Sequence, residues 1–299
     1  MLPFPSFDYV VPTTLEEAVR LCAEPGAIPV AGGTDLLPSL KHRLFEPAPL
    51  VSLSRLPELR GIEATPDGGL SIGAGVTLRE VSRHPDVRRR WPGLAAACET
   101  VGTPTLQAMG TLGGNLMLDT RCMYYNQPAG WRASIGGCLK KDGTVCHVAP
   151  RGKGCYAAHS SDTVPVLWLC GARARYSDRD VSIRDMYQPD GMDWLKVRGL
   201  LVRIELPPPE APVVHRKGRT RAAIDYGWLL AAVRRDPAGY RAVVSAVGPA
   251  PVEVVGEDPA ALAEAAFQAV QPLSTHLAPA TWRKKMVRVE VRRAAESLG

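Results

Sequence analysis

Long hydrophobic runs are missing from this 299-residue sequence. No segment approaches the roughly 18 consecutive apolar residues of a membrane-spanning helix. The opening MLPFPSFDYVVPTT has neither the basic nor the apolar stretch of a secretory signal peptide. We therefore expect a cytoplasmic protein that does not contact a membrane. Stable disulfides are disfavoured in the cytoplasm, so clustered cysteines would indicate metal or redox chemistry.

Signatures of substrate chemistry are missing as well. The sequence has no HExxH zinc motif, no triad pattern and no paired-carboxylate motif, so no catalytic residue is predicted. The net charge is +6, with basic patches at residues 88–90, 216–221 and 282–293. None shows the alternation of basic and aromatic residues typical of nucleic-acid-binding motifs, so no nucleic-acid partner is expected. The patches are either solvated faces or docking surfaces for acidic partners.

The chain is long enough for two domains, and a proline cluster marks the best boundary between them. LLVRIELPPPEAP predicts a strand that ends in this cluster. We expect a mixed fold, α+β or α/β, with one domain at residues 1–208 and a smaller one at residues 209–299. In the first domain, TTLEEAVRLCAE predicts a helix with Thr14 and Glu17 in a capping box, followed by a short buried strand, AIPVA.

The second domain is predicted to contain antiparallel strands and helices. AAIDYGWLLAAVRR and YRAVVSAVG predict two strands joined at a DPAG turn. Asp258 and Pro259 begin a helix, and a basic helix closes the chain.

Two glycine-rich loops are candidates for binding phosphate. VAGGTDLL places Gly32 and Gly33 between a predicted strand and a predicted helix. Backbone N–H groups at such a turn bind phosphate oxygens, and a side chain would block the approach. A plain tight turn explains this loop equally well, and the third glycine of a GxGxxG fingerprint is absent. GTLGGNL, at residues 110–116, is a similar loop, and the pair could hold the two phosphates of a dinucleotide.

Four of the seven cysteines gather in an irregular segment at residues 120–161: they are Cys122, Cys138, Cys146 and Cys155. A stretch this long without regular structure inside a domain indicates either a functional segment or one that is held by a cross-link or a metal. The spacing, C-x15-C-x7-C-x8-C, lacks the short C-x2-4-C step that zinc sites and common ferredoxin motifs use. An iron–sulfur cluster, a zinc site and unliganded thiols are all compatible with it, and four thiolates suit the first two.

Three motifs, in their order and spacing, carry a resemblance to a known family. AGGTDLLPSLKHRL, GTLGGNL and SSDTVPVLWLCGARARY resemble the FAD-binding medium subunit of the molybdenum hydroxylase family, which includes xanthine dehydrogenase and carbon monoxide dehydrogenase. The resemblance covers nearly the whole chain. It implies a two-part FAD-binding domain of the PCMH type, then a smaller α+β domain with an antiparallel sheet and helices.

The resemblance also implies FAD as a cofactor and assigns residues to it. The first loop would hold the FAD pyrophosphate with Gly32, Gly33, Thr34, Asp35 and Leu36, and the second loop would comprise Thr111, Gly113, Gly114 and Asn115. Asp162 matches the acidic residue that binds the flavin side of the cofactor, and Lys217 matches a lysine near the cofactor in some members. The alternatives are a helix N-cap for Asp162 and a solvated side chain for Lys217.

The cysteine segment narrows the resemblance. RCMYYNQ, CLKKDGTVCHV and CYAAHSSD resemble the branch of 4-hydroxybenzoyl-CoA reductase β subunits, which carry an extra [4Fe–4S] cluster in an insert of this kind. This resemblance implies Cys122, Cys138, Cys146 and Cys155 as cluster ligands. The flavin subunit of periplasmic aldehyde oxidoreductase also has a four-cysteine insert, but the sequence between its cysteines is less similar.

The same resemblance implies an electron-transfer subunit with partners. These are a large subunit with the molybdenum cofactor and a small subunit with [2Fe–2S] clusters, in a dimer of heterotrimers, with ferredoxin as the electron donor. The large subunit would remove the para-hydroxyl of 4-hydroxybenzoyl-CoA reductively to give benzoyl-CoA. The alternative within the family is the flavin subunit of an aldehyde or N-heterocycle hydroxylase that passes electrons outward. An alternative from another class is a zinc-stapled scaffold without flavin.

Overall fold

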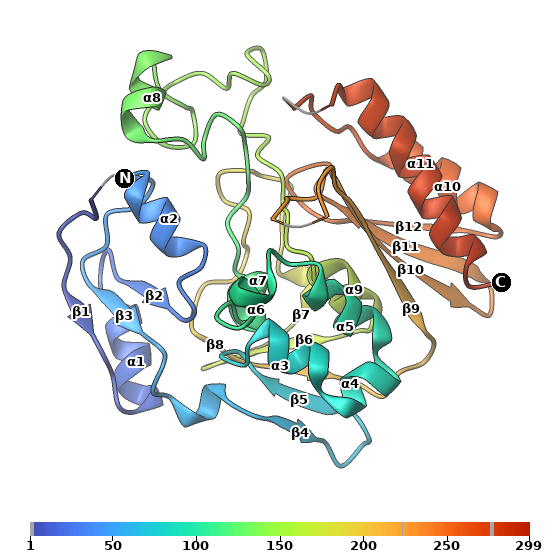
Figure 1. Cartoon of the computed structure of the whole chain (residues 1–299), viewed down its shortest axis with the longest axis horizontal. Coiled ribbons are helices and arrows are strands. Elements are labelled where there is room, and N and C mark those ends of the chain that lie inside the picture. Colours follow the sequence, from blue (N-terminus) through green and yellow to red (C-terminus); the bar gives the residue numbers. More distant parts are fainter. Residues whose placement is uncertain (1–2, 223, 276–277) are drawn as a thin grey trace.

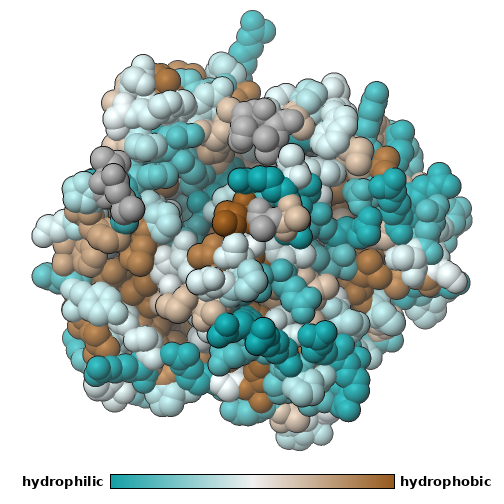
Figure 2. Space-filling model, in the orientation of Figure 1, coloured by the Kyte–Doolittle hydropathy of each residue, from teal (hydrophilic) through white to brown (hydrophobic). Residues whose placement is uncertain are grey.

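The computed structural model describes residues 3–222, 224–275 and 278–299. Three β-sheets lie next to one another, each with its own helices, as Figure 1 shows. The mixed α+β architecture predicted from the sequence is confirmed. Among the described residues, no helix combines the length and the apolar character that a membrane span requires. On the face drawn in Figure 2, hydrophilic residues predominate and hydrophobic residues form small separate patches.

The N-terminal sheet is small and parallel, and it is drawn in blue in Figure 1. Its strands are β1 (Tyr9–Val10), β2 (Ile28–Val30) and β3 (Leu50–Ser52), with β3 in the middle, and its helices are α1 (Leu15–Cys22) and α2 (Leu36–Lys41). Thr14 caps α1 by accepting a hydrogen bond from the N–H of Glu17 (3.2 Å), as predicted. The other half of the predicted capping box is wrong, because the Glu17 carboxylate accepts from the N–H of Thr13 (2.9 Å) and not of Thr14.

The central sheet has five strands in the order β4-β5-β8-β6-β7, and all neighbours are antiparallel. The strands are β4 (Ile62–Ala64), β5 (Leu70–Gly73), β6 (Arg173–Tyr176), β7 (Asp180–Ser182) and β8 (Leu201–Leu206). The helices of this part are α3 (Leu78–Arg83), α4 (Pro85–Arg90), α5 (Pro92–Glu99), α6 (Pro104–Gln107), α7 (Leu112–Leu116) and α9 (Val164–Leu169), with short 3-10 helices η1 (Pro57–Leu59) and η2 (Ile183–Asp185). α3 ends before Pro85, since proline has no N–H to continue the helical hydrogen bonds.

The C-terminal sheet is antiparallel and lies between two layers of helices. Its strands, in the order β12-β11-β10-β9, are β9 (Val213–Gly218), β10 (Leu229–Asp236), β11 (Gly239–Ser245) and β12 (Val252–Gly256). α10 (Pro259–Ala269) and α11 (Ala280–Glu296) cover one face, and α5 and α9 pack against the other. The predicted hairpin is confirmed, because Asp236 pairs with Gly239 at its turn. The first strand of this hairpin begins at Leu229, seven residues later than predicted.

The cysteine segment projects from the fold as an irregular insert, shown in green with α8 (Ala129–Ser134) in Figure 1. Arg121 and Ala158 exchange two backbone hydrogen bonds (both 2.8 Å), which close the base of the insert. Arg132 is almost fully buried and ties the insert to the end of α2, where it donates to the carbonyl oxygen of His42 (3.0 Å). The prediction of an irregular segment is confirmed, and its position is fixed by specific contacts.

Candidate cofactor site

One cavity of about 790 Å³ is lined by residues from all three parts of the chain. The residues of both glycine loops, together with Asp162 and Lys217, were predicted to bind the cofactor, and all of them except Gly113 line this cavity. Its volume lies within the range of roughly 300–1,000 Å³ that is usual for ligand pockets. The structure thus brings together segments that are distant in sequence, as the prediction required.

The first loop turns from the end of β2 into α2. Gly32 is needed for close packing, because a Cβ atom there would lie 1.8 Å from the carbonyl oxygen of Met109. Gly33 has φ +68°, a left-handed conformation that favours glycine. Within the described residues, no backbone acceptor meets the N–H groups of residues 32–36, since the first hydrogen bond of the turn runs from Leu37 to the carbonyl of Gly33 (3.0 Å). These N–H groups are available to phosphate oxygens.

The second loop contributes unequally to the cavity. The hydroxyl of Thr111 accepts a hydrogen bond from the N–H of Gly114 (3.0 Å) and caps α7. Gly113 lies outside the cavity wall, because its N–H donates to the carbonyl of Ala74 (2.9 Å). A Cβ atom at Gly113 would come within 2.7 Å of Ala74. Gly113 therefore packs the loop against the central sheet and does not line the cavity.

Asn115 is buried with a fixed side-chain orientation. Its Oδ1 accepts from the backbone N–H (3.2 Å) and hydroxyl (2.8 Å) of Thr163, and from the hydroxyl of Ser161 (2.8 Å). A backbone N–H can only donate, so the oxygen of the amide faces Thr163 and the NH₂ group is left to donate. Since Asn115 lines the cavity, it offers a donor for a phosphate or for an oxygen of a cofactor ring.

Asp162 and Lys217 form a buried ion pair at the cavity wall. Lys217 Nζ lies 2.6 Å from Asp162 Oδ1 and also donates to the carbonyl of Thr100 (2.9 Å). Their side chains are only 8% and 3% exposed, so the alternative of a solvated Lys217 is wrong. The alternative of an N-cap for Asp162 is also wrong, because Thr163 holds that position. Burial raises the pKa of Asp162, and the ammonium of Lys217 opposes this shift.

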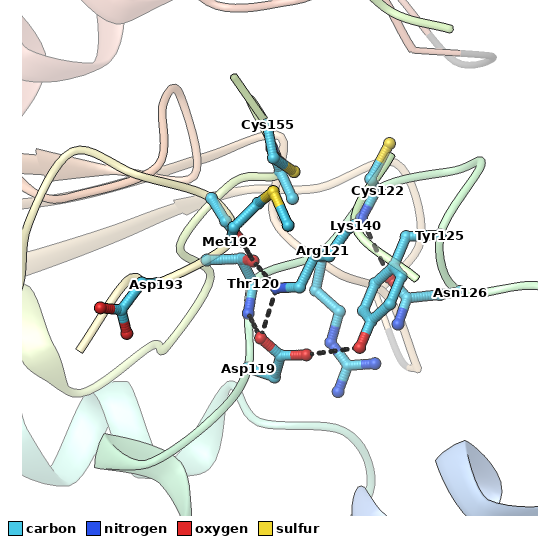
Figure 3. Close-up of polar contacts among 12 residues, drawn as sticks. Asp119, Thr120, Arg121, Cys122, Tyr125, Asn126, Lys140, Cys155, Met192 and Asp193 are labelled. Atoms are coloured by element: carbon cyan, nitrogen blue, oxygen red, sulfur yellow. Dashed lines mark hydrogen bonds and ion pairs between the residues drawn. The ribbon is translucent and has the colours of Figure 1, made fainter. Parts of the chain in front are cut away.

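A polar cluster extends the cavity toward the insert (Figure 3), and no sequence pattern pointed to it. Lys140, from the insert, places its Nζ 2.6 Å from Asp119 Oδ1 and 4.7 Å from the centre of the Tyr125 ring. The Tyr125 hydroxyl donates to Asp119 Oδ2 (2.9 Å). Burial, together with the Asp119 carboxylate, raises the pKa of Tyr125. Lys140 and Asp119 are 21 residues apart, so no sequence pattern announces their contact.

Asp35 has a second role in addition to its place in the first loop. Its carboxylate forms an ion pair with Arg121 at the base of the insert and makes no cap hydrogen bond with α2. The guanidinium of Arg121 lies 5.1 Å from the centre of the Tyr226 ring. The first glycine loop is therefore connected to the insert through Arg121.

The four insert cysteines are free thiols that lie near one another. Burial is the main cause that raises the pKa of Cys122, and the neighbouring Cys138 and Cys146 add to it. Burial, together with Cys122 and Cys146, raises the pKa of Cys155 to about 11. In the described part of the chain, no three Cys, His, Asp or Glu side chains converge closely enough to hold a metal ion. The insert gathers four soft donors, but their positions do not form a closed ligand set.

The cavity residues fit FAD by their chemistry. The first loop, whose N–H groups meet no backbone acceptor among the described residues, lines the cavity. Asn115 adds an amide whose NH₂ group is left to donate, and Asp162 adds a buried carboxylate. Phosphate oxygens accept from such N–H groups, and the N–H groups of a flavin ring or sugar hydroxyls donate to a carboxylate.

Comparisons with known proteins agree with this geometry. The family described as FAD binding domain in molybdopterin dehydrogenase matches residues 5–209. The aldehyde oxidoreductase FAD-binding subunit PaoB of Escherichia coli is 32% identical over 77% of this chain and 77% of its own length. The carbon monoxide dehydrogenase medium chain of Hydrogenophaga pseudoflava is 37% identical over 39% of this chain and 40% of its own length.

The fold also matches a solved structure over nearly its full length. A chain of quinoline 2-oxidoreductase from Pseudomonas putida 86 superposes with a TM-score of 0.77, at 24% identity, over 99% of this chain and 98% of that one. The protein therefore belongs to the FAD-binding medium subunits of the molybdenum hydroxylase family, and it is the FAD subunit of an oxidoreductase.

Proposed function

We propose that this chain is an electron-transfer subunit that holds FAD between its two glycine loops. The observation that carries the proposal is the convergence of both loops, Asp162 and Lys217 on one cavity of about 790 Å³. When bound there, FAD supplies electron transfer in one- and two-electron steps. We also propose that residues 1–208 form the FAD-binding domain and residues 209–299 a second domain.

The residues of the chain would bind and orient the cofactor. The N–H groups of residues 32–36 would donate to the pyrophosphate, and Asn115 would add a side-chain donor. Asp162 would accept a hydrogen bond on the flavin side, while Lys217 holds its carboxylate in place. Trp194 and Leu195 line the cavity and would exclude water.

We propose further that Cys122, Cys138, Cys146 and Cys155 are ligands of a [4Fe–4S] cluster. Four thiolates are the usual donor set for such a cluster. Burial raises the pKa of Cys155, and the ammonium of Lys140 opposes this rise, which would help to stabilise negative charge on the sulfur. The described side chains do not form a closed ligand set, so we derive no step through a cluster.

Cofactor analysis tests both proposals. Protein purified without oxygen is expected to contain roughly one FAD, four iron and four labile sulfides per chain. Stoichiometric zinc without iron would contradict the cluster proposal. Cys146→Ser is expected to lose the cluster signal in electron paramagnetic resonance and to keep its FAD. Cys22→Ser is the matched control, because Cys22 lies on α1 outside the insert and is also partly buried. If Cys146→Ser lost FAD to the same extent as the cluster signal, the main role of the insert would be in folding.

We propose two alternative complexes to which such a subunit would belong, and they differ in the direction of electron flow. The resemblance of the insert favours a 4-hydroxybenzoyl-CoA reductase, in which electrons from ferredoxin would pass inward to [2Fe–2S] clusters and a molybdenum site on partner subunits. The 32% identity to an aldehyde oxidoreductase FAD-binding subunit favours the outward direction, from an aldehyde to an external acceptor.

Assays of the purified complex separate these two complexes. Turnover of 4-hydroxybenzoyl-CoA with reduced ferredoxin supports the reductase. Turnover of an aromatic aldehyde with an oxidised acceptor, without any activity on the thioester, supports the aldehyde oxidoreductase. Subunit analysis of the same preparation tests for a dimer of heterotrimers.

A further inference from the structure

A second cavity, of about 550 Å³, lies between the base of the insert and the C-terminal domain. Its walls are mostly apolar and aromatic, and they include Tyr156, Tyr226, Trp228, Val247 and Leu273. Neither the glycine loops nor the Asp162–Lys217 pair reach it. The cavity therefore adjoins the FAD site without including the predicted cofactor-binding residues, and its walls favour a flat, largely apolar ligand.

Three buried polar atoms in this wall have no hydrogen-bond partner within the described part of the chain. They are Nε of Arg283, Nε of Arg121 and Oγ of Ser160. Arg283 and Ser160 are only 5% and 4% exposed. Buried polar atoms are nearly always hydrogen-bonded, and two of these three can only donate. The ligand that fits them must therefore carry acceptor atoms.

The charge of the wall favours an anion. Arg283 donates to the carbonyl oxygens of Leu273 (2.5 Å), Trp228 (2.8 Å) and Ala246 (2.6 Å), and no carboxylate among the described residues pairs with it. Burial lowers the pKa of Arg283 to about 10, so the group is still a cation at neutral pH. The wall holds three arginines, at positions 121, 221 and 283. Arg121 pairs with Asp35 and Arg221 with Asp225, so the formal charge is 3 − 2 = +1, and Arg283 carries it.

We propose that this cavity binds an aromatic carboxylate. The ring would lie among Tyr226, Trp228 and Leu273, and the carboxylate would accept hydrogen bonds from Arg283 and Ser160. The cavity shares Arg221, Asp225 and Tyr226 with the FAD site. Arg121 in its wall pairs with Asp35 of the first glycine loop. An occupant would therefore be in contact with a residue that also touches the FAD site.

Titration of the FAD-loaded protein with benzoate tests the proposal, with benzyl alcohol as the neutral analogue. We expect saturable binding at one site by calorimetry, with benzoate at least about tenfold tighter than benzyl alcohol. Arg283→Met is expected to weaken benzoate binding by about tenfold or more, and Ser160→Ala by about threefold. Arg292→Met, an exposed position on the same helix, is the matched control and should bind benzoate as the unmodified protein does.

Three results would overturn the proposal: no saturation with benzoate, equal affinity for benzyl alcohol, or unchanged affinity in both Arg283→Met and Ser160→Ala. Circular dichroism checks that Arg283→Met keeps its fold, because Arg283 also holds three carbonyl groups. If that variant unfolds, Ser160→Ala decides, and unchanged benzoate affinity in Ser160→Ala then overturns the proposal.

Discussion

The ion pair between Lys217 and Asp162 joins the C-terminal sheet to the segment before α9 at the candidate cofactor cavity. Lys217 is on β9, Asp162 precedes α9, and the hydroxyl of Thr100 also approaches Asp162 (3.4 Å). A family resemblance predicted each residue near the cofactor. The pairing could not be predicted, because it depends on how β9 packs against the end of α5, far away in the sequence.

Lys217→Met is expected to destabilise the protein strongly. The substitution leaves the Asp162 carboxylate buried without a cation, and losing one partner of a buried pair costs about 3–5 kcal/mol. Urea unfolding at pH 7 measures this loss. The double variant Lys217→Met with Asp162→Asn should recover much of it, since no charge is then left unpaired. A single variant as stable as the unmodified protein would contradict the role of the pair.

Because two histidines are buried, we expect the free energy of unfolding to decrease in mild acid. Burial holds the pKa of His159 at about 3, and burial together with Lys217 and Arg216 holds that of His215 at about 3. In the unfolded chain a histidine binds its proton near pH 6.5, so the unfolded state gains protons first as the pH falls. Each histidine should therefore reduce the free energy of unfolding by about 1.4 kcal/mol per pH unit below roughly pH 6.5.

The urea midpoint at pH 7.5 and at pH 5.5 measures this effect. It is expected to fall between the two values, and to fall less in His159→Gln, which removes one of the two titrating groups. A midpoint that does not change with pH in the unmodified protein would show that the histidines are not held neutral.

At the scale of elements, the loops were easier to predict than the contacts between them. Gly32 and Gly33 were placed correctly because a strand–glycine–helix pattern is local. The different positions of Gly113 and Gly114 could not be predicted, because nothing in GTLGGNL tells which glycine lines the cavity and which packs on Ala74. β9 lies within a segment that looks only basic in the sequence, and its strand structure depends on its pairing with β10.

A buried arginine ties the insert to the end of α2. Arg132 donates to Asp142 (2.8 Å) within the insert and to the carbonyl oxygens of His42 and Arg43 at the end of α2. Arg132→Met is therefore expected to release the insert from α2. Limited proteolysis should then cut within residues 122–157 at least about tenfold faster, since cleavage follows the population of open states.

The exposed Arg88→Met provides the control for Arg132→Met and should be cut at the unmodified rate. If Arg132→Met is cut no faster than the control, the insert is held by other contacts. FAD content in both variants is expected to stay the same, because Arg132 does not line the cofactor cavity.

For the whole molecule, the fold class and the FAD cofactor could be predicted from the sequence, and the arrangement of the insert cysteines in space could not. The order of motifs along the chain defines the family, and the two loops meet because β2 and α7 bring them to one cavity. The positions of the four cysteines depend on the path of an insert that has little regular secondary structure. Their spacing in the sequence therefore does not determine how the four sulfur atoms are arranged.

The most direct test of the central claim is a calorimetric titration of the deflavinated protein with FAD and with riboflavin. We expect roughly one FAD per chain, bound at least about a hundredfold more tightly than riboflavin, because the free N–H groups of residues 32–36 act on the pyrophosphate. Equal affinity for the two flavins, or no binding of FAD, would contradict the account.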